Sequence, residues 1–289
     1  MSAAARAPTK IALIGCGAIG SVVAEALLNS THGLRADRAQ LVAVLVHTPR
    51  AALPPPSEYV LTHDAEVFFA TPFDVCVEVA GQSAVRAHAE RVLRSGRPFL
   101  CTSIGALTDD ALLTTLTDAA LAGGTQLQLA SGAMAALDWM GSSAGDEAAA
   151  AAQRVTATQT KPPESWIGAR FEAGTTNSLP DVIDFAALTV RTVFFEGSAR
   201  DAASAYPKNS NVLAMLALTT AGLDATTVQL VADPVDRSMR SEVKYTGSAG
   251  EIAVRVAGKK SKNPRTSQVV PLSVIKALRN LTSPIAFGL

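Results

Sequence analysis

Three glycines near the start of the chain, Gly15, Gly17 and Gly20, have the spacing G-x-G-x-x-G, which suits the binding of a pyrophosphate. In such a loop the first glycine makes a tight turn, the second lets the phosphates approach the backbone, and the third lets a helix pack on a strand. The free N–H groups at the start of that helix then bind the phosphates. We therefore expect a dinucleotide site at Gly15, Gly17, Ala18, Ile19 and Gly20; the alternative is a purely structural turn.

The end of the second predicted strand bears on the choice of cofactor. A site that prefers NAD usually has an acidic residue there, which binds the ribose hydroxyls, but this chain has His47, Thr48 and then Arg50. Because a hydroxyl and a guanidinium can hold a 2′-phosphate, we expect NADP, or both NADP and NAD. The alternative for Arg50 is a solvated loop residue. We also assign Ala80, which ends the predicted strand over 74–80, to the cofactor site.

Strands and helices alternate along the first part of the chain. Apolar runs typical of buried parallel strands span 10–15, 41–47, 74–80, 98–103 and 125–130. The stretches between them predict helices, one of which is capped by Thr108 and has Asp109 and Asp110 in its first turn. This order predicts an open parallel sheet with helices on both faces, a Rossmann-type fold.

After about residue 131 the pattern changes to that of an α+β domain. Strands over 154–161, 190–197 and 227–233, helices over 198–206 and 211–222, and a hairpin over 241–258 predict a sheet with helices on one face. An amphipathic helix over 269–281 is expected to return to the first domain. The predicted fold class is α/β, with a Rossmann-type domain of residues 1–131 plus about 262–289 and an α+β substrate domain of residues 132–261.

Composition excludes several classes of protein. The chain has 25 Lys and Arg against 25 Asp and Glu, so it lacks the basic surface that nucleic acid requires. Its first apolar run, IALIG, is too short for a signal peptide or a membrane span. Cys16, Cys76 and Cys101 have no metal-ligand spacing and are expected to be reduced thiols. These features predict a cytoplasmic protein that binds no nucleic acid, membrane or metal.

The segment VCVEVAGQSAVRAHAERVLRSGRPFLCTSIGALTD (75–109) closely resembles the corresponding segment of the L-aspartate dehydrogenases. Similar segments follow in order: SGA (131–133), TKPP (160–163), EGSAR (196–200), PKNSN (207–211) and NPRTS (263–267). The resemblance implies oxidation of L-aspartate by NAD or NADP to iminoaspartate, which hydrolyses to oxaloacetate and ammonia or feeds NAD biosynthesis. It also implies a homodimer, which makes the second domain a dimerisation domain as well, and it places Ala133 and Asn211 at the cofactor.

The chain departs from the family at one position of chemical importance. The family has a catalytic histidine in an H-E-[IV] context shortly after an A-D-P segment, whereas this chain has ADP at 232–234 and RSEV at 240–243. Ser241 therefore takes the place of the histidine. The four histidines of the chain, at 32, 47, 63 and 88, all lie in the nucleotide-binding half. Serine does not titrate near neutral pH, so alone it cannot be the base of an amine oxidation.

Other polar residues of the second domain are candidates for the missing chemistry, which needs a base for the ammonium proton and donors for two carboxylates. Lys161 ends a predicted strand, and Lys208, Asn209 and Asn211 lie together between two predicted helices. We hypothesise that the proton goes to Lys161, with its pKa lowered by burial, or to a water positioned by Ser241. Ser241, Lys161 and Lys208 are thus the candidate catalytic residues; the lysines could instead be surface charges, and Asn211 a helix N-cap.

Two further functions remain open at this point. An enzyme with the same fold and cofactor could act on another small acid or amine. Alternatively, because Ser241 replaces the histidine, the protein could bind NADPH without turnover, as a redox sensor or through a partner. Cys101 faintly resembles the nucleophile of phosphorylating semialdehyde dehydrogenases, the alternative being a small buried core residue.

Overall fold

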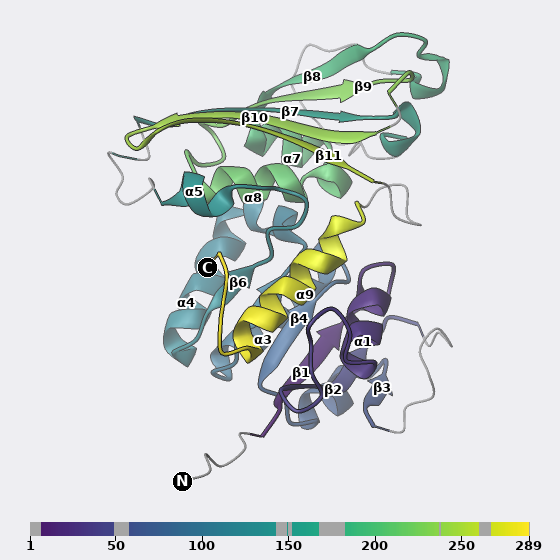
Figure 1. Ribbon diagram of the computed structural model, residues 1–289, viewed down its shortest axis with the longest axis vertical. Helices are drawn as coiled ribbons and strands as arrows, with labels where there is room; N and C mark the ends of the chain where they lie inside the picture. The colour runs from purple at the N-terminus through teal and green to yellow at the C-terminus, as the bar shows by residue number, and fades with distance from the viewer. Residues whose placement is uncertain are drawn as a thin grey trace. The chain divides into compact units, whose positions relative to one another are not determined.

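The computed structural model describes residues 7–48, 58–142, 149, 152–167, 183–236, 238–259 and 267–288. The chain forms two compact units, one of Met1–Ala130 with Val270–Leu289 and the other of Ser131–Val269 (Figure 1). Each unit contains its own sheet.

The first unit is built on a six-stranded sheet in the order β3-β2-β1-β4-β5-β6, and all its strand pairs are parallel. Its strands are β1 (Thr9–Ile14), β2 (Ala39–Leu45), β3 (Val60–Thr62), β4 (Val75–Glu78), β5 (Phe99–Cys101) and β6 (Leu127–Leu129). The strand order reverses between β1 and β4, and open α/β sheets bind ligands at such a switch point. The predicted Rossmann-type sheet is confirmed.

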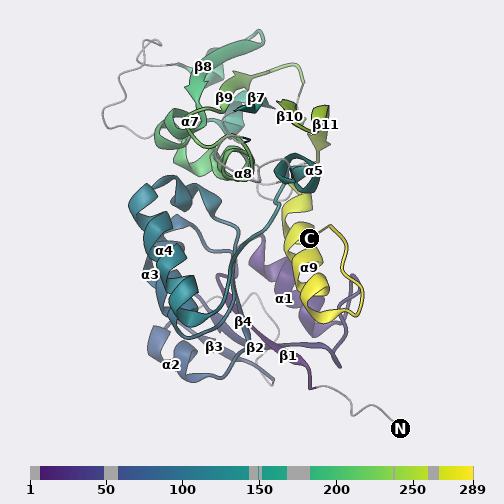
Figure 2. The same ribbon diagram turned by 90° about the vertical axis from the view of Figure 1, so that its left-hand side faces the viewer.

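Helices cover both faces of this sheet, with α1 (Gly20–Leu28) and α9 (Val269–Thr282) on one side and α3 (Gln82–Arg94) and α4 (Asp110–Gly123) on the other (Figure 2). The last helix, α9, buries Val274, Ile275 and Leu278 in the same core as Ile11 and Leu13 of β1. The C-terminal helix therefore belongs to the first unit, as its apolar stripe predicts.

Two local features differ from the sequence-based expectations. The residue that caps α4 is Asp109, whose carboxylate accepts from the backbone N–H groups of Ala111 and Leu112 at 3.1 and 3.2 Å, and not Thr108. Thr108 ends a 3-10 turn, η1 (Ile104–Thr108), which shifts the helix start by one residue. In addition, β3 and the short helix α2 (Ala65–Ala70) were not predicted.

The second unit has a five-stranded sheet in the order β11-β10-β7-β9-β8. Its strands are β7 (Arg154–Lys161), β8 (Thr192–Ser198), β9 (Thr227–Ala232), β10 (Met239–Gly247) and β11 (Gly250–Gly258). β7 and β9 run parallel and the other neighbours antiparallel. The expected strands and the hairpin of β10 and β11 are confirmed.

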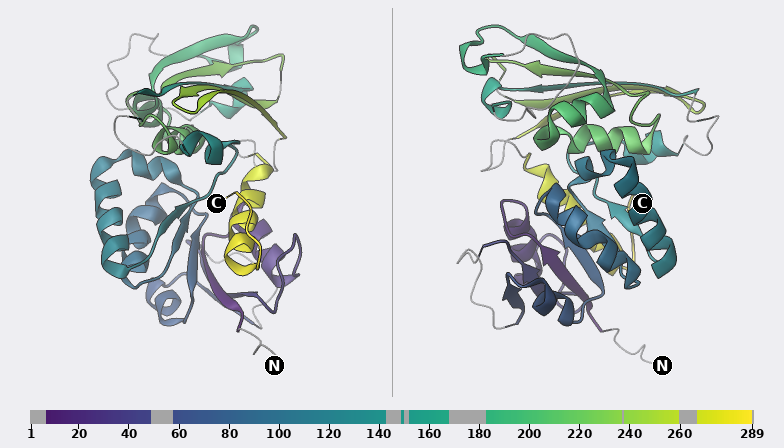
Figure 3. Two further views of the ribbon diagram at one scale, coloured as in Figure 1. Left: turned by 60° about the vertical axis from the view of Figure 1, so that its left-hand side comes forward. Right: turned by 180° about the vertical axis from the view of Figure 1, so that it is seen from behind.

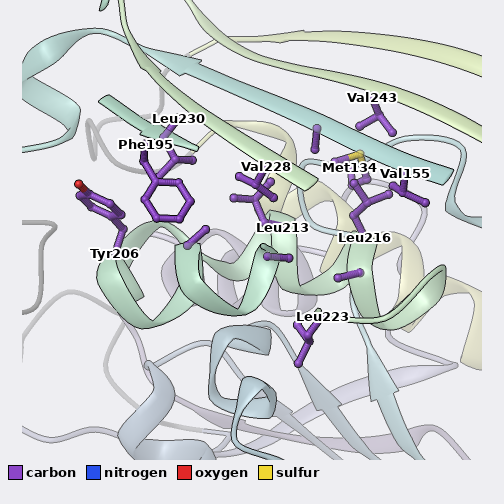
Figure 4. Close-up of a cluster of buried hydrophobic side chains, with 14 of the residues drawn as sticks. Met134, Val155, Phe195, Tyr206, Leu213, Leu216, Leu223, Val228, Leu230 and Val243 are labelled. Carbon is purple, nitrogen blue, oxygen red and sulfur yellow. The ribbon is translucent and has the colours of Figure 1, made fainter. Parts of the chain in front are cut away.

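One face of this second sheet is covered by α7 (Ala199–Ala205) and α8 (Asn211–Thr219), with α5 (Leu137–Gly141) beside them (Figure 3). Leu213 and Leu216 of α8 point toward Val155 of β7 and Val228 of β9 in the core (Figure 4). Short 3-10 turns are η2 (Pro163–Ser165), η3 (Phe185–Ala187) and η4 (Pro207–Asn209). In the part of the chain that the structure describes, no helix combines the length and the apolar character needed to cross a membrane.

Candidate active site

The glycine loop lies at the switch point of the first sheet, between β1 and α1. The N–H of Gly15 donates to the carbonyl of Leu45 at 2.8 Å, and the φ of Gly15 is +102°. A Cβ on Gly15 would lie 2.7 Å from the Cβ of Ala80, and one on Gly20 would lie 2.4 Å from the carbonyl oxygen of Gly15. Both positions therefore require glycine. The fold places Ala80 beside Gly15, and the role of Ala80 at the cofactor stays a prediction.

This loop fits the phosphates of a dinucleotide. A Cβ on Gly17 would meet no atom of the described residues within 4 Å, so its backbone is open to a ligand. The helix α1 begins at Gly20 with no side-chain cap and no acidic residue in its first turn, so its positive N-terminal end is not neutralised by its own side chains. Ala18 and Ile19 lie between Gly17 and the start of α1. NAD or NADP would be held here by the backbone of residues 15–20.

The two ribose-binding candidates that the structure describes, His47 and Thr48, lie exposed after β2. The Nδ1 of His47 is 3.4 Å from the hydroxyl oxygen of Thr48. Arg50 lies outside the described residues. The preference for NADP therefore stays a prediction.

Glu78, the last residue of β4, is a buried carboxylate that the sequence analysis did not single out. It accepts from the backbone N–H groups of Ala80, Gly81, Thr102 and Ser103 at 2.7 to 3.3 Å, and from the Ser103 hydroxyl at 2.8 Å. These donors come from the loops after β4 and β5. The carboxylate therefore ties together two loops at the edge of the sheet where the cofactor is expected.

Cys101 ends β5 and is fully buried, with its thiol 3.7 Å from a carboxylate oxygen of Glu78. Burial first and then the nearby Glu78 raise the pKa of Cys101 well above its ordinary value. A nucleophilic cysteine needs a lowered pKa, so the catalytic-thiol alternative does not fit and Cys101 is a core residue. In the described ranges, no group of three or more His, Cys, Asp or Glu side chains is placed to hold a metal ion.

In the second unit, Lys161 ends β7 and its side chain is buried, with 4% of the residue exposed. Its Nζ donates to the Oδ1 of Asn209 at 2.6 Å and lies 4.7 Å from the ring centroid of Trp166. Burial lowers the pKa of Lys161 to about 7, because removal from water disfavours the charged form. The hypothesis that Lys161 is a surface charge is wrong, and its amine is suited to accept a proton near neutral pH.

Lys161 shares one face of the sheet with Ser241 and Gln159. Alternate residues of a strand point to the same face, and Val155 and Ala157 of β7 lie in the core on the helix side. Gln159 and Lys161 therefore point to that side as well. Ser241 of β10 is the register partner of Gln159, so the half-buried serine lies next to Gln159 on the same face.

Several polar atoms here have no partner among the described residues. They are Oε1 of Gln159 and Nδ2 of Asn209 on side chains that are about nine-tenths buried or more, together with Oγ1 of Thr160 on the opposite face of β7. Buried polar atoms without a partner are rare in folded proteins. The two unpaired atoms of Gln159 and Asn209, on the face that carries the buried amine of Lys161, are what a binding site for a small polar substrate requires.

The arginine beside Ser241 is engaged within the protein. The guanidinium of Arg240 lies 3.6 Å from the carboxylate of Asp233 and also contacts Asp236. Asp233 in turn accepts the N–H groups of Val235 and Asp236 at 3.0 and 2.9 Å. This network fixes the loop between β9 and β10. Ser241 lies on β10.

The remaining predicted site residues also belong to the second unit. Ala133 is half-buried in the segment after β6. Asn211 is the first residue of α8, and the N-cap position is that of Ser210, so the N-cap alternative for Asn211 is wrong. The backbone of Lys208 lies in η4, and its side chain lies outside what the structure describes. The roles of Ala133, Asn211 and Lys208 stay predictions.

Comparison with family models gives two matches that together span most of the chain. Residues 15–130 match the NAD-binding domain of homoserine dehydrogenase, and residues 145–281 match the C-terminal domain of aspartate dehydrogenase. Among solved structures, the aspartate dehydrogenase of Thermotoga maritima aligns with a TM-score of 0.70 and 21% identity, covering 96% of this chain and 99% of that one. A homoserine dehydrogenase from Thiobacillus denitrificans aligns with a TM-score of 0.54 and 14% identity, covering 96% of this chain and 74% of the other. These structures share the fold.

Relatives in sequence support the same assignment. The chain is 37% identical to the L-aspartate dehydrogenase of Polaromonas sp. over 94% of its own length and 97% of that protein. It is 36% identical to the L-aspartate dehydrogenase of Pseudomonas aeruginosa, covering 93% of this chain and 96% of the relative. The resemblance seen in the sequence is confirmed, and this chain belongs to the L-aspartate dehydrogenase family.

Proposed function

We propose that this protein oxidises L-aspartate to iminoaspartate with NAD or NADP as cofactor. The observation that supports this most is the 37% identity to an L-aspartate dehydrogenase over 94% of the chain. The glycine loop, which fits a dinucleotide, and the buried Lys161, which suits an amine substrate, are consistent with it. Iminoaspartate hydrolyses to oxaloacetate and ammonia, or passes as the imine to NAD biosynthesis.

Lys161 is proposed as the base of this reaction. When bound, the oxidised nicotinamide supplies the acceptor for the hydride that leaves the substrate Cα. The neutral amine of Lys161 takes one proton from the substrate ammonium, and the nitrogen lone pair so freed forms the C=N bond as the Cα–H bond breaks. Ser241 lies on the same face of the sheet and is proposed to position a water or the substrate. Lys208 is retained as a second cationic candidate.

We propose NADP as the preferred cofactor, because Thr48 and Arg50 follow β2 where an NAD-preferring site has an acid. The Michaelis constants for NADP and NAD, measured with the same preparation, test this. A Michaelis constant for NAD well below that for NADP would refute it.

We propose a homodimer in the cytoplasm. The face of the second sheet opposite α7 and α8 bears acids and bases side by side, among them Glu196, Glu242, Lys244 and Arg255. A face with both signs of charge can pair with a second copy of itself about a twofold axis. Light scattering after size exclusion should give twice the 29.8 kDa mass of the chain, and a monomer would refute the dimer. The free cysteines agree with a reducing compartment.

The function is tested with the purified protein and L-aspartate, with NAD and NADP supplied separately. We expect formation of reduced nicotinamide together with one equivalent of ammonia. A Ser241→His variant is run beside the wild type, because it restores the residue that the family has at this position.

Each outcome of this assay has a definite meaning. Turnover by the wild type supports the proposal and shows that the family histidine is dispensable. Turnover by the variant alone shows that the wild type binds aspartate but lacks a working base, which refutes the role of Lys161. Absence of turnover in both, with NADPH still bound, refutes aspartate oxidation and favours another small acid or amine, or a sensor.

A further inference from the structure

The side-chain amide of Asn209 has one atom with a hydrogen-bond partner and one without a partner among the described residues. Asn209 ends the turn η4 between α7 and α8, and the residue is 6% exposed. Its Oδ1 accepts from the Nζ of Lys161 at 2.6 Å. Its Nδ2, a donor of two hydrogens, has no partner among the described residues. The amide therefore offers a fixed donor beside the lysine amine.

A buried donor without an acceptor lowers the stability of the folded protein, unless a ligand accepts its hydrogen bond. Leaving a buried polar group without a partner costs about 1 to 3 kcal/mol, and most buried groups in proteins are paired. The Oε1 of Gln159, on the same face of β7 as Lys161, also lacks a partner among the described residues. A donor, an acceptor and an amine within one buried region match the carboxylate and the ammonium of an amino acid.

We propose that Asn209 is a positioning residue, whose carbonyl oxygen holds the Lys161 amine for the substrate ammonium and whose amide nitrogen donates to a carboxylate of the same substrate. The inference rests on the proposed function and adds a residue to it. In the neutral amine, one hydrogen goes to Asn209 and the lone pair remains for the proton of the substrate. In the same complex the amide nitrogen gains the acceptor that it lacks.

Among the described residues, the hydrogen-bond partner of the Lys161 amine is the neutral amide of Asn209 and not a charged side chain. Asp233, after β9, donates its backbone N–H to the Lys161 carbonyl at 3.0 Å, and its carboxylate is engaged by Arg240. Glu164 of η2 is exposed, and α8 has no charged residue. Lys208 is a neighbour in sequence whose side chain lies outside the described residues. Burial alone accounts for the lowered pKa of Lys161, and an amide partner, unlike a carboxylate, leaves it low.

An Asn209→Asp variant tests the inference, because it places an anion where the amide oxygen contacts Lys161. An adjacent opposite charge should raise the pKa of the lysine by about one unit or more. The acid limb of kcat/KM for L-aspartate should move to higher pH by the same amount. The 13Cε titration of Lys161 in protein labelled with 13C-lysine should move with it. Asn29→Asp, an exposed position in the first unit, is the matched control and should move neither.

An Asn209→Ala variant tests the second half of the proposal. It should raise the KM for L-aspartate about tenfold or more and leave the dissociation constant of NADPH unchanged. Thermal unfolding of both variants checks that they fold. An unchanged KM refutes the carboxylate contact.

The two proposals fail in distinguishable ways. The inference is overturned if the wild type turns over L-aspartate but Asn209→Asp changes neither the acid limb of the kcat/KM profile nor the titration midpoint of Lys161. The proposed function would then still stand. A shifted titration in a protein that does not oxidise L-aspartate overturns the proposed function and the carboxylate contact with it, and supports only the pairing of Asn209 with Lys161.

Discussion

Glu78 in the first unit and Lys161 in the second are both buried ionisable residues at the last position of a strand, but their surroundings differ. Glu78 accepts four backbone N–H groups and a hydroxyl. Among the described residues, Lys161 has one side-chain hydrogen bond, to Asn209, and Oε1 of Gln159 and Nδ2 of Asn209 lack a partner. The carboxylate is fully provided with donors, whereas the amine has room for a further partner.

This contrast separates a structural buried group from a functional one. A buried carboxylate with a full set of hydrogen bonds holds its loops in place. A buried amine with few bonds keeps a shifted pKa and is available to a ligand, which is typical of active sites. Mutation should therefore reduce stability at Glu78 and activity at Lys161.

The largest expected effect is on activity at Lys161. Lys161→Met keeps the length of the side chain and removes the amine, so turnover of L-aspartate should fall by about a thousandfold or more. The free energy of unfolding should change by less than about 3 kcal/mol, because removal of a costly buried amine offsets the loss of the donor to Oδ1 of Asn209. Steady-state rates and thermal unfolding check both parts.

The control for this variant is Lys259→Met, the same change at an exposed lysine of the second unit, which should keep full activity. Unchanged turnover in Lys161→Met would remove Lys161 from the mechanism.

The next largest effect is on stability at Glu78. Glu78→Gln replaces one acceptor by an amide donor that faces backbone N–H groups, and it should lower the free energy of unfolding by about 1 to 3 kcal/mol. Chemical denaturation measures the change. Glu25→Gln, at an exposed position of α1, should change it by less than about 0.5 kcal/mol. A stable Glu78→Gln variant would contradict the structural role.

A smaller effect is expected at Gln159, whose Oε1 is buried without a partner among the described residues. Gln159→Leu removes an acceptor meant for substrate, so kcat/KM should fall about tenfold, while the melting temperature should not fall. Gln126→Leu, at an exposed position in the first unit, should leave kcat/KM unchanged. A lower melting temperature with normal kcat/KM would make Gln159 a structural residue like Glu78.

The sequence predicted well what depends on local pattern. The parallel strands, the helix α9 and the glycine loop follow from apolar runs and from residues that are neighbours along the chain. β3 was missed because Val60–Thr62 has only two apolar residues and closely follows a proline run over 54–56, which indicates a loop. The start of α4 was misplaced because the 3-10 turn before it brings Asp109, and not Thr108, to the capping position.

The candidate site was predicted only in part, because its contacts join distant segments. Lys161 was singled out from its place at the end of a strand, but its bond to Asn209 spans 48 residues. The donors to Glu78 meet only when the loops after β4 and β5 come together. The unpaired Oε1 of Gln159 reflects how the helices pack over β7, and no residue pattern indicates it.

The most direct test of the account is the pKa of Lys161 in the wild-type protein. The chain has eight lysines, so 13Cε titration of protein labelled with 13C-lysine gives few signals, and the one absent from Lys161→Met is assigned to Lys161. We predict a midpoint at about 7, so that the amine is neutral above this pH and activity rises as the pH increases through it. A midpoint near the ordinary lysine value of about 10.4 would mean that the amine is charged at neutral pH, and would contradict its role as the base.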